Sequence, residues 1–460
     1  MAVYRVVHPA IDMYRRINGF RTERFDENKS IMRGLTTPVQ RTNGKIRDIL
    51  TSLTRPLTIT NYCRLFDIVG SSNDLPQWQN IFNHFSKETD YKNLYGEWGK
   101  GFPTLSACCS NIPVEIEFEA AKDPNTIVYS SPDHNIKDSV WDFSVSPRVP
   151  IGSMAKAAFF ILGNVYGLRG IKVSTKPSGA VAKSGGLESS NAFVYSLHWA
   201  GATLAGTGHG PGELFSRSVN DSNYAFNDLT GGQGISASIE GGYHTFKYLV
   251  GPGMLGYISH ETIPPSAYGE IESHIDLVQP GKNFSLHTKR SAKDVNKVWC
   301  ERNTDVEGFN MNSEIPQLGT RFAEMLRNAA VNKDEKAWEE AVKIANRQAV
   351  GIRAKLCPEY FSGNESFVEE VIKMGGAPFA LGAGGPETMF AILGPLGLTK
   401  AVRNKFDLEP ITEEIAKDVL ASNGVLQGYV PYKINEKGMT HSDDWSKFGP
   451  IPPEPLKIEI

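Results

Sequence analysis

The clearest periodic pattern in the chain lies in the segment IPVEIEFEA, residues 112–120. Apolar Val114, Ile116 and Phe118 alternate with glutamates, which is the period-2 pattern of a β-strand with one face in water. The segments GIKVSTKP (170–177) and PFALGAGGPETMFAIL (378–393) are also strand-like. Strand signals therefore dominate between about residues 60 and 260 and recur near the C-terminal end.

Helical periodicity dominates the later part of the chain. In DEKAWEEAVKIANRQAVGIRAKL (334–356), Trp338, Ala341, Val342 and Ala345 share one apolar stripe opposite charged residues. The segment TEEIAKDVLASNG (412–424) ends in an Asn-Gly pair that can close a helix. These patterns predict a mixed α+β protein in two halves, with IPPSAYGEIES (263–273) as the junction.

Composition narrows the class of protein. The chain has 460 residues, which is long for one core and predicts two domains. Its net charge of -3 gives no reason to expect nucleic acid or an anionic membrane as a partner, and it has no apolar run of about twenty residues. The N-terminus has no secretory pattern and the five cysteines form no disulfide framework, so we expect a cytoplasmic protein.

The charge is unevenly spread along the chain. Residues 1–60 carry eleven Lys and Arg against five Asp and Glu. This segment is interpreted as a basic N-terminal extension over residues 1–58. It either joins subunits in a homo-oligomer or contacts an acidic ligand, or it wraps on its own protein.

Candidate chemistry begins with KSGGLESSNAF, residues 183–193, which follows a strand-like segment and precedes an apolar run of small residues. A strand, a glycine-rich turn and a helix place free N–H groups at a helix N-terminus, where an anion is favoured. The chain contains neither GxxxxGK[ST] nor a GxGxxG after a strand. On its own the segment fits a phosphate-binding loop or a simple tight turn.

Three segments together resemble the signature of the GHMP kinases. They are RLFDIVGSSNDLP (64–76), GLESSNA (186–192) and LGAGGPETMFAIL (381–393), in the family's order. The first is most similar to the heptose 7-phosphate kinase and fucokinase branch. The resemblance spans about residues 60 to 395 and implies an α+β, two-domain fold. Its ribosomal protein S5-like N-terminal domain would cover 59–262, and its ferredoxin-like C-terminal domain 263–460.

The resemblance also implies roles for individual residues. Ser190 matches a serine that helps to hold Mg²⁺, and Arg64 matches a cation that stabilises the transferred phosphoryl group. Asp74 matches an acid that binds sugar hydroxyls. The expected residues of the ATP phosphate site are Gly185, Gly186, Glu188, Ser189, Ser190, Gly382, Gly384 and Gly385.

The sequence departs from the family pattern at positions that matter for catalysis. Gly234 stands where sugar kinases carry a catalytic aspartate. Glu188 replaces a loop glycine and puts a carboxylate beside the phosphates, which should weaken ATP binding unless a cation compensates. Asp221, as a magnesium ligand, and Asp228, as a catalytic acid, could substitute. Both could instead cap backbone N–H groups in a loop.

Two functions follow from this pattern. The first is an ATP- and magnesium-dependent kinase for a small molecule, a sugar or sugar phosphate. The alternative is a GHMP-fold protein without phosphoryl transfer, either a ligand-binding or scaffolding subunit or an enzyme of altered chemistry on a phosphorylated small molecule. His209, and the pair Tyr95 and Trp98, are weaker candidates for ligand contact.

Overall fold

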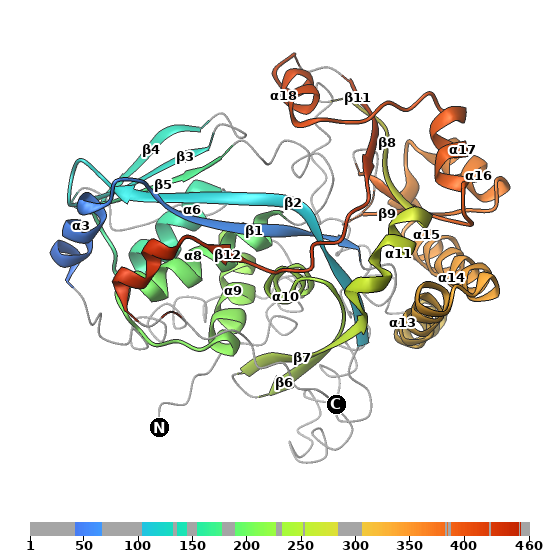
Figure 1. Ribbon diagram of the computed structural model, residues 1–460, viewed down its shortest axis with the longest axis horizontal. Helices are drawn as coiled ribbons and strands as arrows, with labels where there is room; N and C mark the ends of the chain where they lie inside the picture. Colours follow the sequence, from blue (N-terminus) through green and yellow to red (C-terminus); the bar gives the residue numbers. More distant parts are fainter. Residues whose placement is uncertain are drawn as a thin grey trace.

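The structure is a computed structural model and describes residues 42–66, 104–131, 136–144, 154–176, 189–226, 232–251, 254–283, 306–381, 384, 388–422, 425–449 and 451. These residues form two β-sheets, each with helices packed on it (Figure 1). The α+β expectation is confirmed.

The larger sheet has the strand order β12-β1-β2-β5-β3-β4, and the hairpin of β6 and β7 pairs with the first part of β2. Within it β3 and β5 run parallel and the other pairs antiparallel. The strands are β1 Leu57–Phe66, β2 Thr104–Ala120, β3 Thr126–Ser131, β4 Ile136–Asp142, β5 Ile171–Thr175, β6 Tyr243–Gly251, β7 Met254–Ile263 and β12 Thr440–His441.

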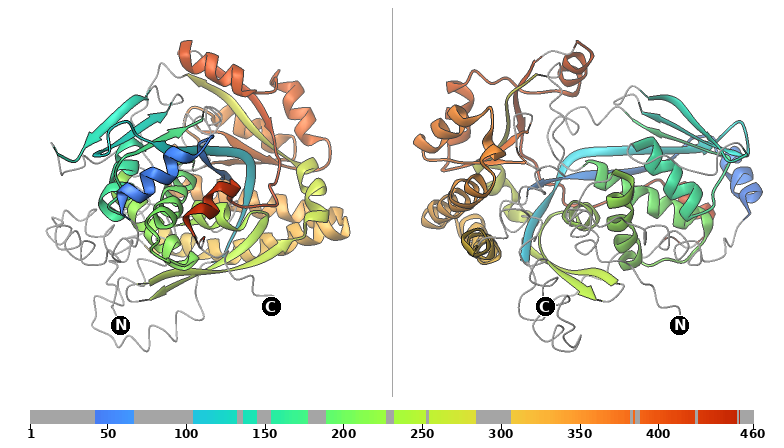
Figure 2. Two further views of the ribbon diagram at one scale, coloured as in Figure 1. Left: turned by 60° about the vertical axis from the view of Figure 1, so that its left-hand side comes forward. Right: turned by 180° about the vertical axis from the view of Figure 1, so that it is seen from behind.

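Helices cover one face of this sheet (Figures 1 and 2). They are α6 Met154–Ala158, the π-helix η2 Phe159–Val165, α8 Ser189–Ala205, α9 Pro211–Phe226 and α10 Gln233–Glu240. Helix α3, Asn43–Ser52, packs at one end of the sheet through Ile46 and Leu50. The alternation predicted for residues 112–120 is confirmed, because Ile116 and Phe118 are buried while Glu119 is exposed.

The smaller sheet is antiparallel, with the strand order β11-β8-β10-β9. Its strands are β8 Ile275–Asn283, β9 Ala377–Ala380, β10 Phe390–Leu393 and β11 Val425–Pro431. The 3-10 turn η3 Pro265–Ala267 and helix α11 Tyr268–His274 connect it to the larger sheet. The segment 263–273 therefore lies between the last strand of the larger sheet's hairpin and the first strand of the smaller sheet.

The pairing of β9 with β10 shows which side chains lie on each face of the smaller sheet. Phe390 pairs with Ala380, whereas Phe379 pairs with Ala391, so the two phenylalanines point to opposite faces. The ring of Phe390 contacts Phe367 of α16, and the ring of Phe379 lies beside Arg353. The surrounding helices are α13 Val306–Asn332, α14 Glu335–Gln348, η4 Ala349–Arg353, α15 Ala354–Leu356, η5 Pro358–Phe361, α16 Glu365–Lys373, α17 Leu398–Lys405 and α18 Glu413–Ser422.

After β11 the chain returns to the larger sheet, which the sequence analysis did not foresee. We call residues 432–449 the return segment. It adds β12 to the edge of β1 and continues into η6, Asp443–Phe448 (Figure 1). Trp445 of η6 is buried in edge-to-face contact with Phe118 and Trp199, and its indole N–H donates to the Thr58 carbonyl at 3.0 Å. The return segment thus closes the hydrophobic core of the larger sheet.

Candidate functional site

The opening of helix α8 is the centre of the candidate site. Strand β5 ends at Thr175 and α8 begins at Ser189, so the expected strand and helix on either side of the segment are confirmed. Ser189 and Ser190 form the first turn and are half-buried. Because the first N–H groups of a helix have no intrahelical acceptor, this end can bind an anion. Gly185, Gly186 and Glu188 lie outside the described residues.

Helix α8 is held firmly, which fixes the direction of its N-terminus. Every residue from Asn191 to Ala205 is buried. Asn61 of β1, fully buried, donates from its side-chain amide to the Ala192 carbonyl at 2.9 Å and to the Ser196 hydroxyl at 3.1 Å. Sequence reasoning missed Asn61, although its inward position on β1, in phase with the buried Leu57 and Ile59, was a usable signal.

Arg64 lies in an irregular part of β1. Arg64 pairs with Cys109, and the register shifts on both sides of it, between Tyr62 and Arg64 and between Arg64 and Phe66. Bulges of this kind redirect side chains and are common beside active sites. The structure thus places the Arg64 backbone in β1 next to α8 and α10, both of which contact this strand. Asp74 lies outside the described residues.

Gly234 lies in the first turn of α10. The helix begins after Gly232, whose φ of 86° is left-handed and whose added Cβ would lie 2.8 Å from the Phe215 ring. Gly234 is buried, and α10 packs against both β1 and α8. The position where sugar kinases would carry an aspartate is therefore close to the other site elements but offers no side chain. Asp228, the suggested substitute, lies outside the described residues.

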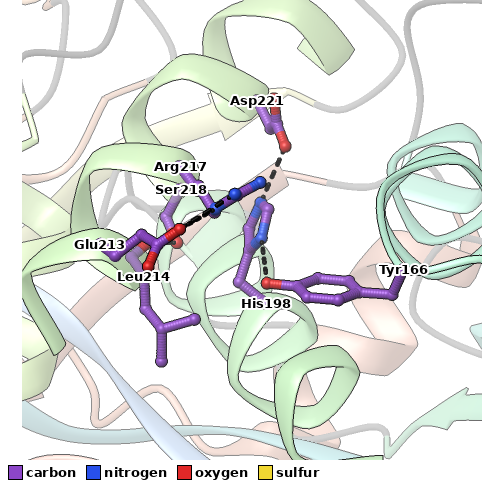
Figure 3. A network of polar contacts seen from close by, with 7 residues as sticks. All are labelled: Tyr166, His198, Glu213, Leu214, Arg217, Ser218 and Asp221. Carbon is purple, nitrogen blue, oxygen red and sulfur yellow. Dashed lines mark hydrogen bonds and ion pairs between the residues drawn. The ribbon is translucent and has the colours of Figure 1, made fainter. Parts of the chain in front are cut away.

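Asp221, predicted either as a magnesium ligand or as a cap of backbone N–H groups in a loop, lies in helix α9. It is 2% exposed, and its Oδ2 is 3.0 Å from His198 Nε2 (Figure 3). The other ring nitrogen of His198, Nδ1, is 3.1 Å from the Tyr166 hydroxyl. Nε2 and the Asp221 oxygen are thus at ion-pair distance without hydrogen-bond geometry, whereas Nδ1 shares a hydrogen bond with the Tyr166 hydroxyl, and a neutral ring with its proton on Nε2 accepts that bond at Nδ1. Burial lowers the pKa of His198 despite Asp221, and it raises the pKa of Tyr166.

A second set of contacts extends this network along α9. Arg217 donates two hydrogen bonds to Glu213 at 3.0 and 3.1 Å (Figure 3). His209 Nδ1 is 2.7 Å from the same carboxylate. Burial raises the pKa of Glu213, but the contacts with His209 and Arg217 outweigh it, and the net shift is downward. His209, a candidate for ligand contact by sequence, is thus a buried partner of Glu213.

The expected magnesium pair of Ser190 and Asp221 is not brought together by these contacts. Asp221 is bound to His198, which follows Ser190 by eight residues in α8. Eight residues correspond to about 12 Å along a helix. In the part of the chain that the structure describes, no group of three or more His, Cys, Asp or Glu side chains is arranged to hold a metal ion. In this structure the Asp221 carboxylate is paired with His198. The Ser190 hydroxyl would therefore need another carboxylate beside it to hold a metal ion.

The third glycine-rich segment connects β9 to β10, and between these strands the structure describes Leu381, Gly384, Thr388 and Met389. Leu381 N–H donates to the Met389 carbonyl at 2.9 Å, and the Thr388 hydroxyl donates to the Leu381 carbonyl. Gly384 has a φ of 73°, and an added Cβ would lie 2.5 Å from the Tyr360 ring. A glycine is therefore required at 384 by Tyr360. Gly382 and Gly385 lie outside the described residues, as do Tyr95 and Trp98.

Comparison with solved structures identifies this architecture. Lactococcus lactis galactokinase complexed with galactose matches with a TM-score of 0.54 at 11% identity, over 87% of this chain and 98% of that one. A D-glycero-D-manno-heptose 1-phosphate kinase from Bacteroides thetaiotaomicron matches with a TM-score of 0.52 at 13% identity, over 84% and 99%. The chain has the GHMP kinase fold. At these identities the likeness shows the fold alone.

Comparison of the sequence itself gives a different result. No protein-family model and no curated protein matches the chain. The resemblance carried by the three glycine-rich segments is thus supported by the fold of kinases for sugars and related small molecules, and the branch within that group stays a prediction. Among the described helices, none is both long and apolar enough to cross a bilayer.

Proposed function

We propose that the protein is a GHMP-type kinase that transfers the γ-phosphoryl group of ATP to a hydroxyl of a sugar or sugar phosphate. The observation that carries the proposal is the N-terminus of α8. It presents Ser189 and Ser190 at the end of a rigid, buried helix within a fold shared with galactokinase. Neighbours with this fold act on galactose and on a heptose phosphate, which supports a carbohydrate acceptor.

ATP and Mg²⁺ fit the described residues in part. Free N–H groups and two hydroxyls at the start of α8 suit phosphate oxygens, and the Ser190 hydroxyl suits one position of an oxygen-liganded cation. Bound Mg²⁺ would neutralise charge on the phosphates. To act as the carboxylate ligand of Mg²⁺, Asp221 would have to leave its contact with His198.

Residues of the chain itself would stabilise charge, orient the acceptor and accept its proton. Arg64 would stabilise charge on the transferred group, and Asp74 would orient the acceptor hydroxyl. Asp228 would receive the proton of that hydroxyl, because Gly234 has no side chain to accept it. Phosphoryl transfer depends mainly on positioning and charge stabilisation, so loss of the usual base lowers the rate without removing the reaction.

The second candidate is a GHMP-fold protein without phosphoryl transfer, acting as a ligand-binding or scaffolding subunit or through altered chemistry on a phosphorylated small molecule. The observation in its favour is that two acidic functions are missing together. Gly234 is buried without a carboxylate, and Asp221 is held by His198.

A thermal-shift and transfer experiment tests the proposal. We expect ATP with Mg²⁺ to raise the melting temperature, and ³²P to move from ATP to one member of a panel of hexoses, heptoses and their phosphates. Ser190→Ala should raise the Mg²⁺ concentration for half-maximal effect by about tenfold, the size expected for losing a bond to a charged partner. Ser422→Ala, on exposed α18, is the matched control.

Gly234→Asp adds a decisive comparison. If the site lacks only its base, this variant should transfer phosphate faster than the wild type. If neither protein transfers phosphate to any acceptor of the panel, the kinase proposal fails and the second candidate replaces it.

A further inference from the structure

Two connections join the two lobes of the molecule, a lobe being one sheet with the helices packed on it. In chain order the described strands change from the larger to the smaller sheet between β7 and β8, and back between β11 and β12 (Figure 1). The first connection contains η3 and α11, and the second begins the return segment. Each starts at proline, Pro264–Pro265 and Pro431, whose rings fix φ and stiffen the backbone.

Glu272 ties the second connection to the first. It lies in α11, and its side chain is 13% exposed. One carboxylate oxygen, Oε1, accepts the Ile434 N–H at 3.0 Å, and the other, Oε2, is 2.5 Å from Lys433 Nζ. Hydrogen bonds to an ionised group are stronger than those between neutral groups. Glu272 therefore holds both a backbone group and a side chain of the return segment.

Both connections also bind the same short stretch of the larger lobe, where α10 is followed by β6. The Gly242 N–H donates to the Asn435 carbonyl at 2.6 Å, and the Tyr243 N–H donates to the Tyr268 hydroxyl of α11 at 3.1 Å. An added Cβ on Gly242 would lie 2.5 Å from that hydroxyl, so the packing is close. Three pieces of chain distant in sequence thus form a closed ring of contacts, which we call the clasp: Gly242–Tyr243, Tyr268–Glu272 and Ile434–Asn435.

The other end of α11 is bound to the smaller lobe. The His274 ring stacks on the Trp338 indole of α14, with ring centres 3.9 Å apart and 7° between their planes. The Gly394 N–H, directly after β10, donates to the His274 carbonyl at 3.1 Å. Helix α11 is thus fixed to the larger lobe through Tyr268 and to the smaller lobe through His274, with Glu272 between them.

Helix α13 makes a second kind of contact between the lobes. It packs on β2 and β7 of the larger sheet as well as on α14. Packed helices can slide past their neighbours by small amounts. A hydrogen bond is more restrictive, because its strength depends steeply on distance and direction. Packing of α13 therefore resists separation of the lobes, whereas the clasp sets their relative orientation.

We propose that Glu272 is a positioning residue that locks the two connections together and thereby fixes the orientation of the smaller lobe relative to α10 and the larger lobe. Either connection alone permits rotation at its backbone dihedrals. With both joined through Glu272 and both bonded at Gly242–Tyr243, rotation of the lobes has to break the clasp. The inference goes beyond the proposed function and is independent of whether the protein transfers phosphate.

The spread of distances between the lobes tests the inference directly. Spin labels attached through an unnatural amino acid in place of Asp48 of α3 and Glu369 of α16, both exposed, leave the native cysteines untouched. Pulsed electron paramagnetic resonance should give one narrow distance distribution for the otherwise wild-type chain and a broader one for Glu272→Ala. Glu272→Gln keeps an acceptor for the Ile434 N–H and should restore most of the narrow width. Lys437→Met, which removes an exposed cation of the return segment, is the control and should change nothing.

Hydrogen exchange measured by mass spectrometry tests whether the clasp acts as a unit. In Glu272→Ala, the Gly242 and Tyr243 amides should exchange about tenfold faster, the size expected for loss of one hydrogen bond to a charged group. Neither amide is bonded to Glu272, so this acceleration reports the clasp and not the deleted contact. The peptide that covers β3 should keep its wild-type rate. Lys433→Met removes only the half-exposed partner of the ion pair and should have a smaller effect.

The two measurements together decide the inference. A broader distance distribution in Glu272→Ala with faster exchange at Gly242–Tyr243 supports it. An unchanged width overturns it, as does acceleration that is confined to the Ile434 amide or shared equally by all peptides. If Glu272→Ala does not fold, Tyr268→Phe decides by the same criteria, because it removes the acceptor of the Tyr243 N–H from another side of the clasp.

Discussion

His198 shows what burial does to a single titratable residue in this protein. It is fully buried between Tyr166 and Asp221, and both of its nitrogens are used. Desolvation lowers its pKa, Asp221 acts in the opposite direction, and Arg217 and His209 add to the lowering. The neutral ring is therefore the form that the fold selects, and a proton on both nitrogens would require the Tyr166 hydroxyl to accept from Nδ1 instead of donating to it.

This residue predicts a pH dependence of stability. An unfolded histidine has a pKa of about 6.5, and in the folded protein the pKa of His198 is lower. Below about pH 6.5 the unfolded chain binds a proton that the folded chain does not, so the free energy of unfolding falls as the pH falls. For this group the slope approaches about 1.4 kcal/mol per pH unit. Urea unfolding at pH 7.5, 6.5 and 5.5 measures it.

The comparison variant is His198→Gln, whose amide nitrogen can still donate to Asp221 but does not titrate. It should be less stable than the wild type at pH 7.5 and lose less on acidification. His441→Gln, which removes an exposed imidazole, corrects for the loss of one histidine. Parallel stability curves for wild type and His198→Gln would show that His198 is not the source of the acid sensitivity.

At the scale of elements, the return segment and α10 are joined by close backbone contact. An added Cβ on Gly438 would lie 2.0 Å from the Ile239 carbonyl oxygen. The Met439 N–H donates to the Ser238 carbonyl at 3.0 Å, and the Gly242 N–H donates to the Asn435 carbonyl. The end of α10 is therefore held against residues almost two hundred positions later in the chain. Through α10 the return segment supports the site elements around Gly234.

Gly438→Ala tests this crossing. The new methyl group has no room beside Ile239, so we expect the free energy of unfolding in urea to fall by about 1–3 kcal/mol, the cost of overpacking. Gly269→Ala is the matched control, since its Cβ meets nothing within 4 Å and it lies in helix α11, where alanine is favoured over glycine. Opposite signs are expected for the two variants. Equal changes in the free energy of unfolding for the two variants would mean that the chain accommodates a methyl group at residue 438 without strain.

The sequence predicts elements where periodicity is strong and local. The alternation at 112–120 and the apolar stripe at 334–356 give the correct elements, although the π-turn η4 inside the second is invisible to a 3.6-residue pattern. Helix α9 was missed because its inward face carries Glu213, Arg217 and Asp221, four residues apart. The inward face of a helix is usually apolar, so charged residues there hide the helix from a hydrophobic periodicity pattern. The partners of these charges, His198 and His209, come from other segments.

For site residues too, local sequence patterns were detectable and contacts between residues distant in sequence were not. The three motif segments were detectable because their residue types stand close together in the sequence, and Gly384 shows the backbone freedom that the third one needs. Their supports were not, because Asn61 and Tyr360 act through contacts with residues distant in sequence.

At the scale of the whole molecule, only part of the predicted N-terminal extension lies outside the fold that the structure describes. Residues 1–41 carry eight Lys and Arg against four Asp and Glu. The later part of the predicted extension belongs to the fold, because α3 buries Ile46 and Leu50 and β1 begins at Leu57. A deletion that tests the extension should therefore stop at residue 41 and leave α3 in place.

Deletion of residues 1–41 distinguishes the two interpretations of the extension. If it joins subunits, the deleted protein should show a lower mass by light scattering at the same concentration, with an unchanged circular dichroism spectrum. The wild type at high ionic strength provides a comparison, since salt weakens contacts made by a basic segment. An unchanged mass would exclude a role in joining subunits and leave contact with an acidic ligand or with the protein's own surface.

The pairing of β12 with β1 can form only late in synthesis, because β12 is made long after β1. The Thr58 N–H bonds to the Ser442 hydroxyl, 384 residues later. At ordinary rates of synthesis, roughly 20 to 80 seconds separate the emergence of these two residues from the ribosome. During that interval the edge of β1 that β12 later pairs has no partner, and Phe118 and Trp199 lack the indole of Trp445 that covers them. A nascent chain stalled before residue 440 would present an open strand edge beside uncovered aromatic rings, the kind of surface that chaperones bind.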